Sequence, residues 1–372
     1  MFAACASGPT TPRPEALFND QLFLAPTERI SADDVFALSA EMQQLLNGEF
    51  AVQLRRKDSR EALIDAIYGK GPLTLEYDSA MTRNAAQAFA ARSGNCLSLV
   101  IMTAAFAKAL GLPFQFQRVY VDETIGRTDD IYFFIGHVNL TLGAKEPSVG
   151  LRRSAPDLMT IDFLPPKEMR GLRVRAIDEQ TIVAMYMNNR AAEAFAQGKV
   201  NDAYWWARAA VRHDTNFLSA YNTLGVIYRR HGNPLEAEKV LAFALERDPT
   251  NTHAMSNLVG VLNDLGRVAD AKKLTLKLEQ LEPNSPFRHV EPGLQALRDG
   301  NYQRARDLFA KEVGRIPSDH EMHYWLARAY VGLGDMERAR QQLALALEFS
   351  TTRFDHDIYA AKLNRIKSSQ LQ

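Results

Sequence analysis

A spacing of 34 residues runs through the second half of the chain. Glycine and alanine each recur five times at this step, and proline recurs three times. The residues concerned are Gly198, Gly232, Gly266, Gly300, Gly334, Ala203, Ala237, Ala271, Ala305, Ala339, Pro249, Pro283 and Pro317. Chance does not align two residue types five times over. Residues 184–353 are therefore predicted to hold five copies of one structural unit without insertion.

The period and the residues that keep it resemble the tetratricopeptide repeat. In that repeat two helices form one unit, with glycine in the turn between them and alanine where they touch closely. Residues 218–251 carry the pattern most fully, at Tyr221, Leu224, Gly225, Tyr228, Ala237, Leu241, Ala244 and Pro249. The resemblance implies an all-α solenoid, with a capping helix and tail in residues 354–372 covering its exposed end.

The concave face of such a solenoid accepts an extended segment or a helix of a protein partner. The resemblance places the groove on the first helix of each repeat. Those positions include Asn222, Arg229, Arg230, His253, Asn263, Arg298, Tyr324 and Arg328. Asparagine suits a peptide backbone and arginine suits a carboxylate, so we expect a polar, mildly cationic groove. For any single residue the alternative is an ordinary solvated side chain.

The first half of the chain holds few residues that could act as a nucleophile or base. Cys96 is the one cysteine and His137 the one histidine within residues 28–168. Asn95 is a good helix N-cap, and the apolar run after it is predicted to be a helix that ends at Gly111. A thiol in the first turn of a helix faces unpaired backbone N–H groups and the positive end of the helix dipole. Both features favour the thiolate, and the N–H groups could hold an oxyanion.

Three β-patterned stretches follow this helix, at residues 114–121, 131–142 and 158–163. His137 lies in the second and Asp162 in the third. If these two strands pair antiparallel, Asp162 can lie beside His137 and orient its imidazole. Before the thiol, helices are expected over 31–45 with a capping box at Ser31, over 58–68 and over 79–92.

The wording Arg92-Ser-Gly-Asn-Cys-Leu-Ser-Leu, the later Leu110-Gly-Leu-Pro, a strand histidine and a strand aspartate resemble the bacterial transglutaminase-like superfamily. The likeness is greatest to its SirB-type branch and extends from Arg92 to Pro165. It implies a papain-related α+β domain over residues 28–168, in which a nucleophile helix packs on an antiparallel sheet. By that match Cys96 is the nucleophile, His137 the base and Asp162 the orienting residue. No cofactor is implied.

Two functions from different classes follow. In the first, a cysteine-dependent transglutaminase-like domain attacks an amide or similar acyl group, by hydrolysis or transamidation, and the repeats recruit the protein that carries it. In the second, the chain is a non-catalytic scaffold, because free cysteines and strand histidines are often ordinary core residues. A third hypothesis is a chaperone-like adaptor that reads C-terminal carboxylates through the arginines of the groove, of which Arg229 and Arg230 are the pair to test.

The composition and residue spacing argue against nucleic acid, a membrane span and a metal site. Lysine plus arginine equals aspartate plus glutamate at 44 each, so there is no net field to attract nucleic acid. No apolar run approaches the roughly 18 residues needed to span a bilayer. His320 and His323 are three residues apart, whereas the metalloprotease helix needs a spacing of four, so no metal site is expected.

The two remaining segments are predicted to carry no chemistry. Residues 1–27 are expected to be a flexible tail, although Phe2-Ala-Ala-Cys-Ala-Ser7 resembles a lipoprotein cleavage box. If translation starts upstream, Cys5 would be the lipid anchor of a periplasmic protein; otherwise the chain is expected in the cytoplasm. Residues 169–183, with Arg170, Arg173 and Arg175, are expected to be a solvated linker.

Overall fold

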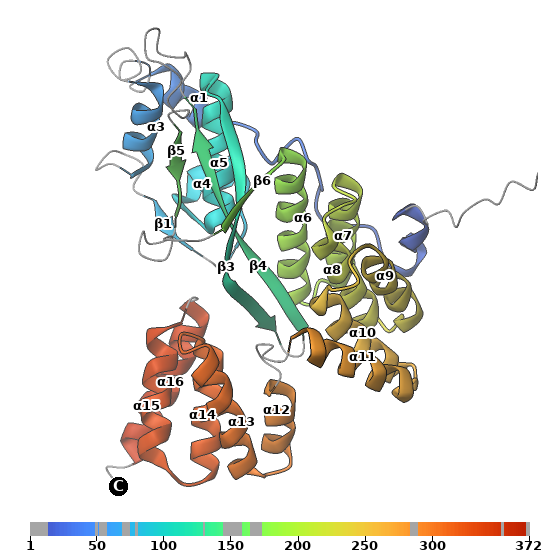
Figure 1. The fold of residues 1–372 in the computed structure, drawn as a ribbon. Coiled ribbons are helices and arrows are strands. Elements are labelled where there is room, and N and C mark those ends of the chain that lie inside the picture. Colours follow the sequence, from blue (N-terminus) through green and yellow to red (C-terminus); the bar gives the residue numbers. More distant parts are fainter. Residues whose placement is uncertain are drawn as a thin grey trace, which may run out of the picture. The chain divides into compact units, whose positions relative to one another are not determined.

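The computed structural model of this chain describes residues 14–48, 51, 58–68, 75–78, 81–128, 131–143, 158–163, 173–282, 289–350 and 353–369 (Figure 1). The chain forms two compact units. The first comprises Met1–Tyr77 and Met81–Leu276, and the second comprises Lys277–Gln372 with Asp78–Ala80. Cys5, Arg170 and the expected lipoprotein box lie outside the described residues. Within the described ranges, none of the helices combines the length and apolarity that crossing a lipid bilayer requires.

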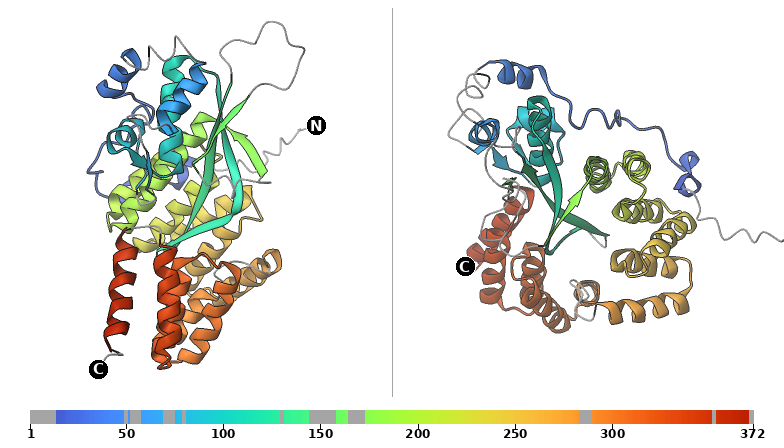
Figure 2. Two further views of the ribbon diagram at one scale, coloured as in Figure 1. Left: turned by 90° about the vertical axis from the view of Figure 1, so that its left-hand side faces the viewer. Right: turned by 45° about the horizontal axis from the view of Figure 1, so that its top comes forward.

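An α+β part occupies the N-terminal half of the first unit. Its main sheet has four antiparallel strands in the order β5-β4-β3-β6, which are β3 (Phe114–Thr128), β4 (Ile131–Leu142), β5 (Met159–Ile161) and β6 (Arg173–Ile177). Its helices and small strands are α1 (Ala40–Asn47), α3 (Ser59–Tyr68), β1 (Glu76–Tyr77), α4 (Ala85–Ala91), β2 (Ser93–Gly94) and α5 (Cys96–Leu110). Two 3-10 helices, η1 (Pro14–Leu17) and η2 (Asp20–Leu22), precede this part in the sequence. Helix α5 packs against β4 (Figure 2).

Helix α5 is the centre of this part, and the sequence predicts both of its ends. Its N-cap is Asn95, whose Oδ1 accepts from the backbone N–H of Ser98 at 2.9 Å. Its C-cap is Gly111, with a left-handed φ of 65° that favours glycine. Every residue from Cys96 to Ala107 is buried. A helix that is apolar all round in this way belongs in a core, between other elements.

The helix expected over residues 31–45 begins later than predicted. It starts at Ala40, where Ser39 caps α1 by accepting from Met42 N at 3.2 Å. The capping box at Ser31 is wrong because the backbone near Val35 is used elsewhere. The Val35 carbonyl accepts from Ala85 N at 3.0 Å, and the Val35 side chain is fully buried. A helix through this position would have needed that carbonyl for its own ladder.

The segment expected as a linker contains regular structure. Residues Arg173–Ile177 form β6, which pairs antiparallel with β3, and helix α6 begins two residues later, at Glu179. The side chains of Arg173 and Arg175 are exposed, as expected for solvated residues. Val174 and Ala176 alternate with Arg173 and Arg175, a period of two that is typical of a strand, although residues 173–176 are all exposed.

The 34-residue repeats are helix pairs. In the first unit these are α6 (Glu179–Ala196), α7 (Val200–His213), α8 (Leu218–Arg230), α9 (Pro234–Arg247), α10 (Thr252–Asp264) and α11 (Val268–Leu281), the last of which contains the boundary between the units. The second unit has α12 (Val290–Arg298), α13 (Tyr302–Arg315), α14 (His320–Gly332), α15 (Met336–Glu348) and α16 (Arg353–Ser369). Helix α16 packs on α15, as expected for a capping helix.

The periodic glycines and alanines have the roles predicted for them. The five glycines adopt φ values between 72° and 85° in the turns between paired helices. Such left-handed backbone strains any residue that has a Cβ atom. The five alanines are at most 3% exposed, where two helices approach closely. Turn glycines and buried alanines therefore recur at the 34-residue step in the described helices.

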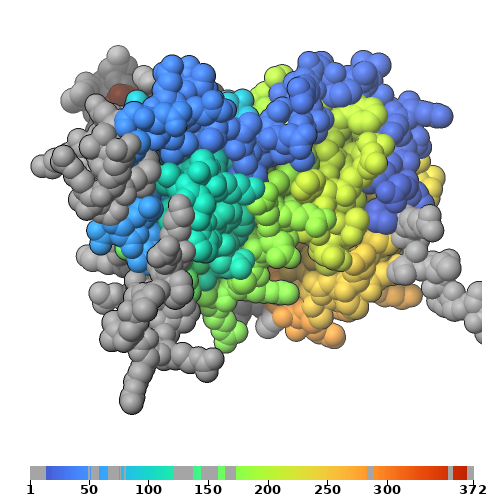
Figure 3. Space-filling model, turned by 90° about the horizontal axis from the view of Figure 1, so that it is seen from above, coloured from blue at the N-terminus to red at the C-terminus, as the bar shows by residue number. Residues whose placement is uncertain are grey.

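Residues 14–30, which we call the N-terminal strap, lie on the surface of the repeats (Figure 3). The Phe23 ring stacks on Tyr204 with centroids 3.9 Å apart, and the 3-10 helix η1 contacts α7 and α9. Backbone groups are also held: Tyr228 Oη accepts from Asn19 N at 2.8 Å, and Asp202 accepts from Thr27 N at 2.6 Å. The structure thus differs from the expected flexible tail from residue 14 onward, because the strap is hydrogen-bonded to the repeats and its Leu17 and Phe23 side chains are buried.

Candidate functional site

Cys96, His137 and Asp162 come from three neighbouring elements of the α+β part. Cys96 is the first residue of α5, His137 lies in β4, and Asp162 follows directly after β5. Strands β4 and β5 pair antiparallel with Leu140 opposite Ile161. Because the chains run in opposite directions, this register brings the residue after Ile161 toward the segment 137–139.

The imidazole of His137 and the carboxylate of Asp162 form a buried pair. His137 Nε2 lies 2.8 Å from Asp162 Oδ1, and the two side chains are 6% and 11% exposed. The second carboxylate oxygen accepts from Asn139 Nδ2 at 2.9 Å. Two fixed partners leave the carboxylate little rotational freedom, so it can hold the ring in one orientation.

The environment of His137 favours the charged ring. Burial lowers the pKa of the imidazole, but hydrogen bonds to Asp162 and Cys96, together with the charges of both partners, outweigh burial and raise it to about 9. Since Nε2 faces Asp162, the nitrogen left for the Cys96 side chain is Nδ1. The ring therefore interacts with a thiol and with a carboxylate, which are the two partners that the base of a thiol nucleophile requires.

The Cys96 residue is only 6% exposed, and it is a free thiol. It stands in the first helical turn, beside backbone N–H groups that have no partner within the helix. That position gives the sulfur two sources of positive charge, the end of the helix and the His137 ring. The arrangement can stabilise a thiolate and, during acyl transfer, an oxyanion.

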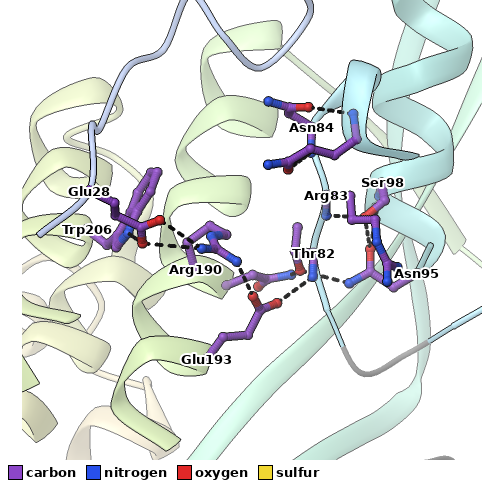
Figure 4. Close-up of polar contacts among 11 residues, drawn as sticks. Glu28, Thr82, Arg83, Asn84, Asn95, Ser98, Arg190, Glu193 and Trp206 are labelled. Carbon is purple, nitrogen blue, oxygen red and sulfur yellow. Dashed lines mark hydrogen bonds and ion pairs between the residues drawn. The ribbon is translucent and has the colours of Figure 1, made fainter. Parts of the chain in front are cut away.

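A hydrogen-bonded network fixes the cap of this helix (Figure 4). Asn95 Oδ1 accepts from Ser98 N at 2.9 Å and from Ser98 Oγ at 2.8 Å, while Asn95 Nδ2 donates to Thr82 Oγ1 at 2.8 Å. Ser98 Oγ in turn accepts from Arg83 N at 2.8 Å. Donors and acceptors alternate along the whole path, so the Asn95 amide has one orientation that satisfies them all.

The network continues into the first repeat. Thr82 N donates to Glu193 Oε1 at 2.6 Å, and Asn189 Nδ2 donates to Thr82 Oγ1 at 3.2 Å. The other oxygen of Glu193 accepts from Arg190 at 3.0 Å. Arg190 also pairs with Glu28 of the N-terminal strap at 3.2 Å, as Figure 4 shows. Side chains of α6 are therefore connected to the residue that caps the thiol helix.

In the first unit, some residues expected to line a partner groove are buried or paired with other side chains, and others are exposed. Asn222 is buried, and its Oδ1 accepts from Asn257 Nδ2 at 2.8 Å, so its carbonyl is used between helices. Arg229 forms an ion pair with Asp264 at 2.5 Å. His253 is half-buried, and Arg230 and Asn263 are exposed.

In the second unit the expected groove residues make local contacts. Arg298 Nη2 donates to Gln295 Oε1 at 2.8 Å on the same helix. Tyr324 packs against Tyr359 of α16 with ring centroids 5.3 Å apart. The Arg328 guanidinium lies 5.0 Å from the Trp325 ring centroid, yet the residue is exposed. The capping helix thus covers Tyr324, while the two arginines remain on the surface.

His320 and His323, whose sequence spacing does not suit a metal site, form hydrogen bonds within the second unit. His320 Nδ1 lies 2.9 Å from the Tyr359 hydroxyl, and His323 contacts Gln342 and the Pro317 carbonyl at 2.7 and 2.9 Å. Both rings join helices of the second unit. Among the residues that the structure describes, no three His, Cys, Asp or Glu side chains gather as metal ligands would.

Sequence reasoning missed three residues of the site. Asn139 shares the alternating face of β4 with His137, and that two-residue spacing could have pointed to it. Thr82 and Glu193 had no such signal, since they are 111 residues apart and meet only through the packing of α6. Neither residue belongs to a recognisable motif.

Comparisons with known proteins bear on the repeats. Two tetratricopeptide repeat family models match residues 228–289 and 293–353. A TPR repeat-containing protein of Pseudomonas aeruginosa is 26% identical over 150 residues, which are 40% of this chain and 25% of that protein. Cellulose synthase operon protein C of Xanthomonas axonopodis pv. citri is 31% identical over 166 residues, which are 41% of this chain and 10% of that protein. The chain thus spans a quarter or less of either relative.

Solved structures are similar over about half of the chain. A thermophilic TPR protein of Thermus thermophilus is 18% identical with a TM-score of 0.38, covering 51% of this chain and all of that one. A TPR protein described as having an unusual peptide-binding site is 20% identical with a TM-score of 0.27, covering 48% of this chain and 92% of that one. On the family matches and the helix pairs together, the chain carries tetratricopeptide repeats.

Proposed function

We propose that this protein is a two-module acyl-transfer protein. The α+β part, residues 28–168, would be a transglutaminase-like domain that attacks an amide or similar acyl group through Cys96, and the repeats would bind the protein or peptide that carries this group. The observation that carries the proposal is the position of the His137 ring, which interacts with Cys96 and with Asp162 at once. Few arrangements other than a nucleophile system need a histidine so placed.

The chemistry balances with the side chains present. The Cys96 sulfur forms a bond to the acyl carbon, and the N–H groups at the start of α5 face the oxygen that gains negative charge. As the carbon–nitrogen bond breaks, the His137 imidazolium gives its proton to the leaving amine. Water or a second amine then attacks the thioester and gives its proton to His137, and the carbon–sulfur bond breaks to restore the thiolate. Hydrolysis and transamidation differ only in this second nucleophile.

The repeats support the second half of the proposal. Tetratricopeptide repeats are protein-interaction modules, and helix pairs of this kind follow one another from α6 to α15 in the part of the chain that the structure describes. Of the residues expected to line a groove, Arg230 and Asn263 in the first unit, and Arg298 and Arg328 in the second, are exposed, so a partner could reach them. Their character suits a polar or acidic segment. A lipid anchor at Cys5 stays part of the proposal only if translation starts upstream.

Alkylation by iodoacetamide tests the nucleophile. In a Cys5→Ser chain, which leaves Cys96 as the one thiol, we expect the labelling rate to reach half its maximum well below pH 8.5, about the value for a free thiol. A His137→Gln variant should move that midpoint toward 8.5. Burial slows labelling equally at every pH, so the midpoint, and not the absolute rate, carries the information. A wild-type midpoint near 8.5 would refute the proposal.

The second candidate is a scaffold in which both modules bind partners and Cys96 is a core residue. The observation in its favour is the 6% exposure of Cys96, which is typical of inert cysteines. The two functions differ in what Cys96→Ser does. A scaffold keeps partner binding and biological function with serine at this position, whereas an acyl-transfer protein keeps binding and loses turnover.

A further inference from the structure

The first repeat is joined to the thiol helix by the network that runs from Glu193 to Asn95. This connection lies within one compact unit, and every contact in it involves a described residue. The network does not touch the sulfur. It touches the amide that caps the helix whose first residue is Cys96, so its effect on the thiol must pass through that cap.

Thr82 decides which way the Asn95 amide points. Its Oγ1 accepts from Asn95 Nδ2, which leaves Asn95 Oδ1 to accept from Ser98 N. If the amide rotated by half a turn, its NH₂ group would meet the Ser98 N–H, and two donors would face each other. Thr82 is 1% exposed, so water does not readily replace its hydroxyl. The correct rotamer of the cap therefore depends on this acceptor.

Glu193 holds Thr82 in place. The Thr82 N–H, on an irregular stretch before α4, donates to Glu193 Oε1 at 2.6 Å, and the same carboxylate is fixed from the other side by Arg190. Asn189, one helical turn earlier on α6, donates to Thr82 Oγ1. Backbone and side chain of Thr82 are thus both bound to α6, the first helix of the first repeat.

We infer that Thr82 and Glu193 are positioning residues for the Cys96 thiol, because they fix the amide cap of the helix that carries it. The first tetratricopeptide repeat is then a structural part of the acyl-transfer site as well as of the binding module. This inference rests on the proposed function of Cys96. It assigns no chemical step to Thr82 or Glu193.

The test is the pH profile of Cys96 alkylation by iodoacetamide in the full-length Cys5→Ser chain. Thr82→Val keeps the shape of the side chain and removes the acceptor. We expect its labelling rate at low pH to fall by up to about fivefold, the largest factor by which a helix N-terminus commonly stabilises a nearby anion, and the midpoint to rise. Thr82→Ser restores the hydroxyl and should restore the wild-type profile.

Two further variants separate positioning from loss of stability. Glu193→Gln offers an acceptor to only one of its two donors, so the midpoint should rise by less than in Thr82→Val. Thr103→Val is the matched control, since this fully buried threonine on the same helix bonds to the Leu99 carbonyl at 2.7 Å and has no part in the cap. It should lower the melting temperature without moving the midpoint.

The outcomes are distinguishable. If wild-type Cys96 reacts with a midpoint near 8.5, the proposed function is overturned and the inference falls with it. If the wild-type midpoint is low and stays low in Thr82→Val and Glu193→Gln, the proposed function stands and the positioning role is overturned. A shift in Thr103→Val equal to that in Thr82→Val would also overturn it, because any destabilisation would then suffice.

Discussion

The Asp162 carboxylate stabilises a positive charge on His137, and removing that carboxylate should show how strongly. In Asp162→Asn the ring keeps its burial, which lowers its pKa, and loses the negative partner 2.8 Å away. We therefore expect the pKa of His137 to fall well below 9, because only Cys96 then opposes the effect of burial. The difference between 6.5 and 9 corresponds to about 3 kcal/mol of preference for the charged ring in the folded chain.

This preference makes stability depend on pH in a definite direction. Because the folded-state pKa lies above the unfolded value, the contribution of His137 is fully present below about pH 6.5 and is lost as pH rises through 9. Asp162→Asn should therefore destabilise the first unit more at pH 6 than at pH 9.5, by up to about 3 kcal/mol.

Two measurements check the prediction. Histidine side-chain NMR gives the titration of His137 directly, with the signal assigned by its absence in His137→Gln. In a Trp325→Phe background, Trp205 and Trp206 report unfolding of the first unit alone, since the chain has three tryptophans. Asp202→Asn is the matched control, because Asp202 is also buried and accepts its hydrogen bonds from Thr27, which does not titrate. A wild-type titration at or below 6.5, or one that Asp162→Asn leaves unchanged, would falsify the reasoning.

Two predictions concern the parts around the site. Phe23→Ala removes the ring that stacks on Tyr204 at 3.9 Å and should destabilise the first unit by about 3 kcal/mol, releasing the N-terminal strap to limited proteolysis; a strap that stays protected contradicts this. Gly232→Ala places a Cβ atom at a residue with a φ of 85° and should lower the free energy of unfolding, measured in urea, by about 1 kcal/mol. Gly314→Ala lies in a helix with open space around it and should leave that free energy unchanged or raise it. Equal effects of the two substitutions would argue against backbone strain.

The sequence predicts the features that local chemistry or strict periodicity determines. The 34-residue step predicts the helix pairs, and the order Asn95, apolar run, Gly111 predicts both ends of α5. The antiparallel pairing of β4 with β5 was a condition of the prediction, and the structure has it, which brings Asp162 to His137. Each of these depends on residues close in sequence or on alternation within one strand.

What the sequence does not predict depends on contacts between distant segments. The capping box at Ser31 looks correct locally, but the Val35 carbonyl bonds to Ala85 instead. The strap looks like a tail because its buried residues are few, and the aromatic side chains that cover it lie about 180 residues away. No local sequence pattern marks Thr82 or Glu193, because the two residues come together only when α6 packs beside α5.

The packing of α6 explains why the boundary expected at residues 169–183 does not divide the structure. Residues 182–188 are all buried, and seven consecutive positions cover every face of a helix. A terminal helix of a solenoid normally exposes one face and needs a cap. At the C-terminal end α16 supplies that cap. At the N-terminal end α6 contacts α5 and β3, and Lys108 of α5 forms an ion pair with Glu179 of α6 at 2.5 Å. The α+β part is therefore the cap of the solenoid, and the same contacts that bury α6 fix the helix that carries Cys96.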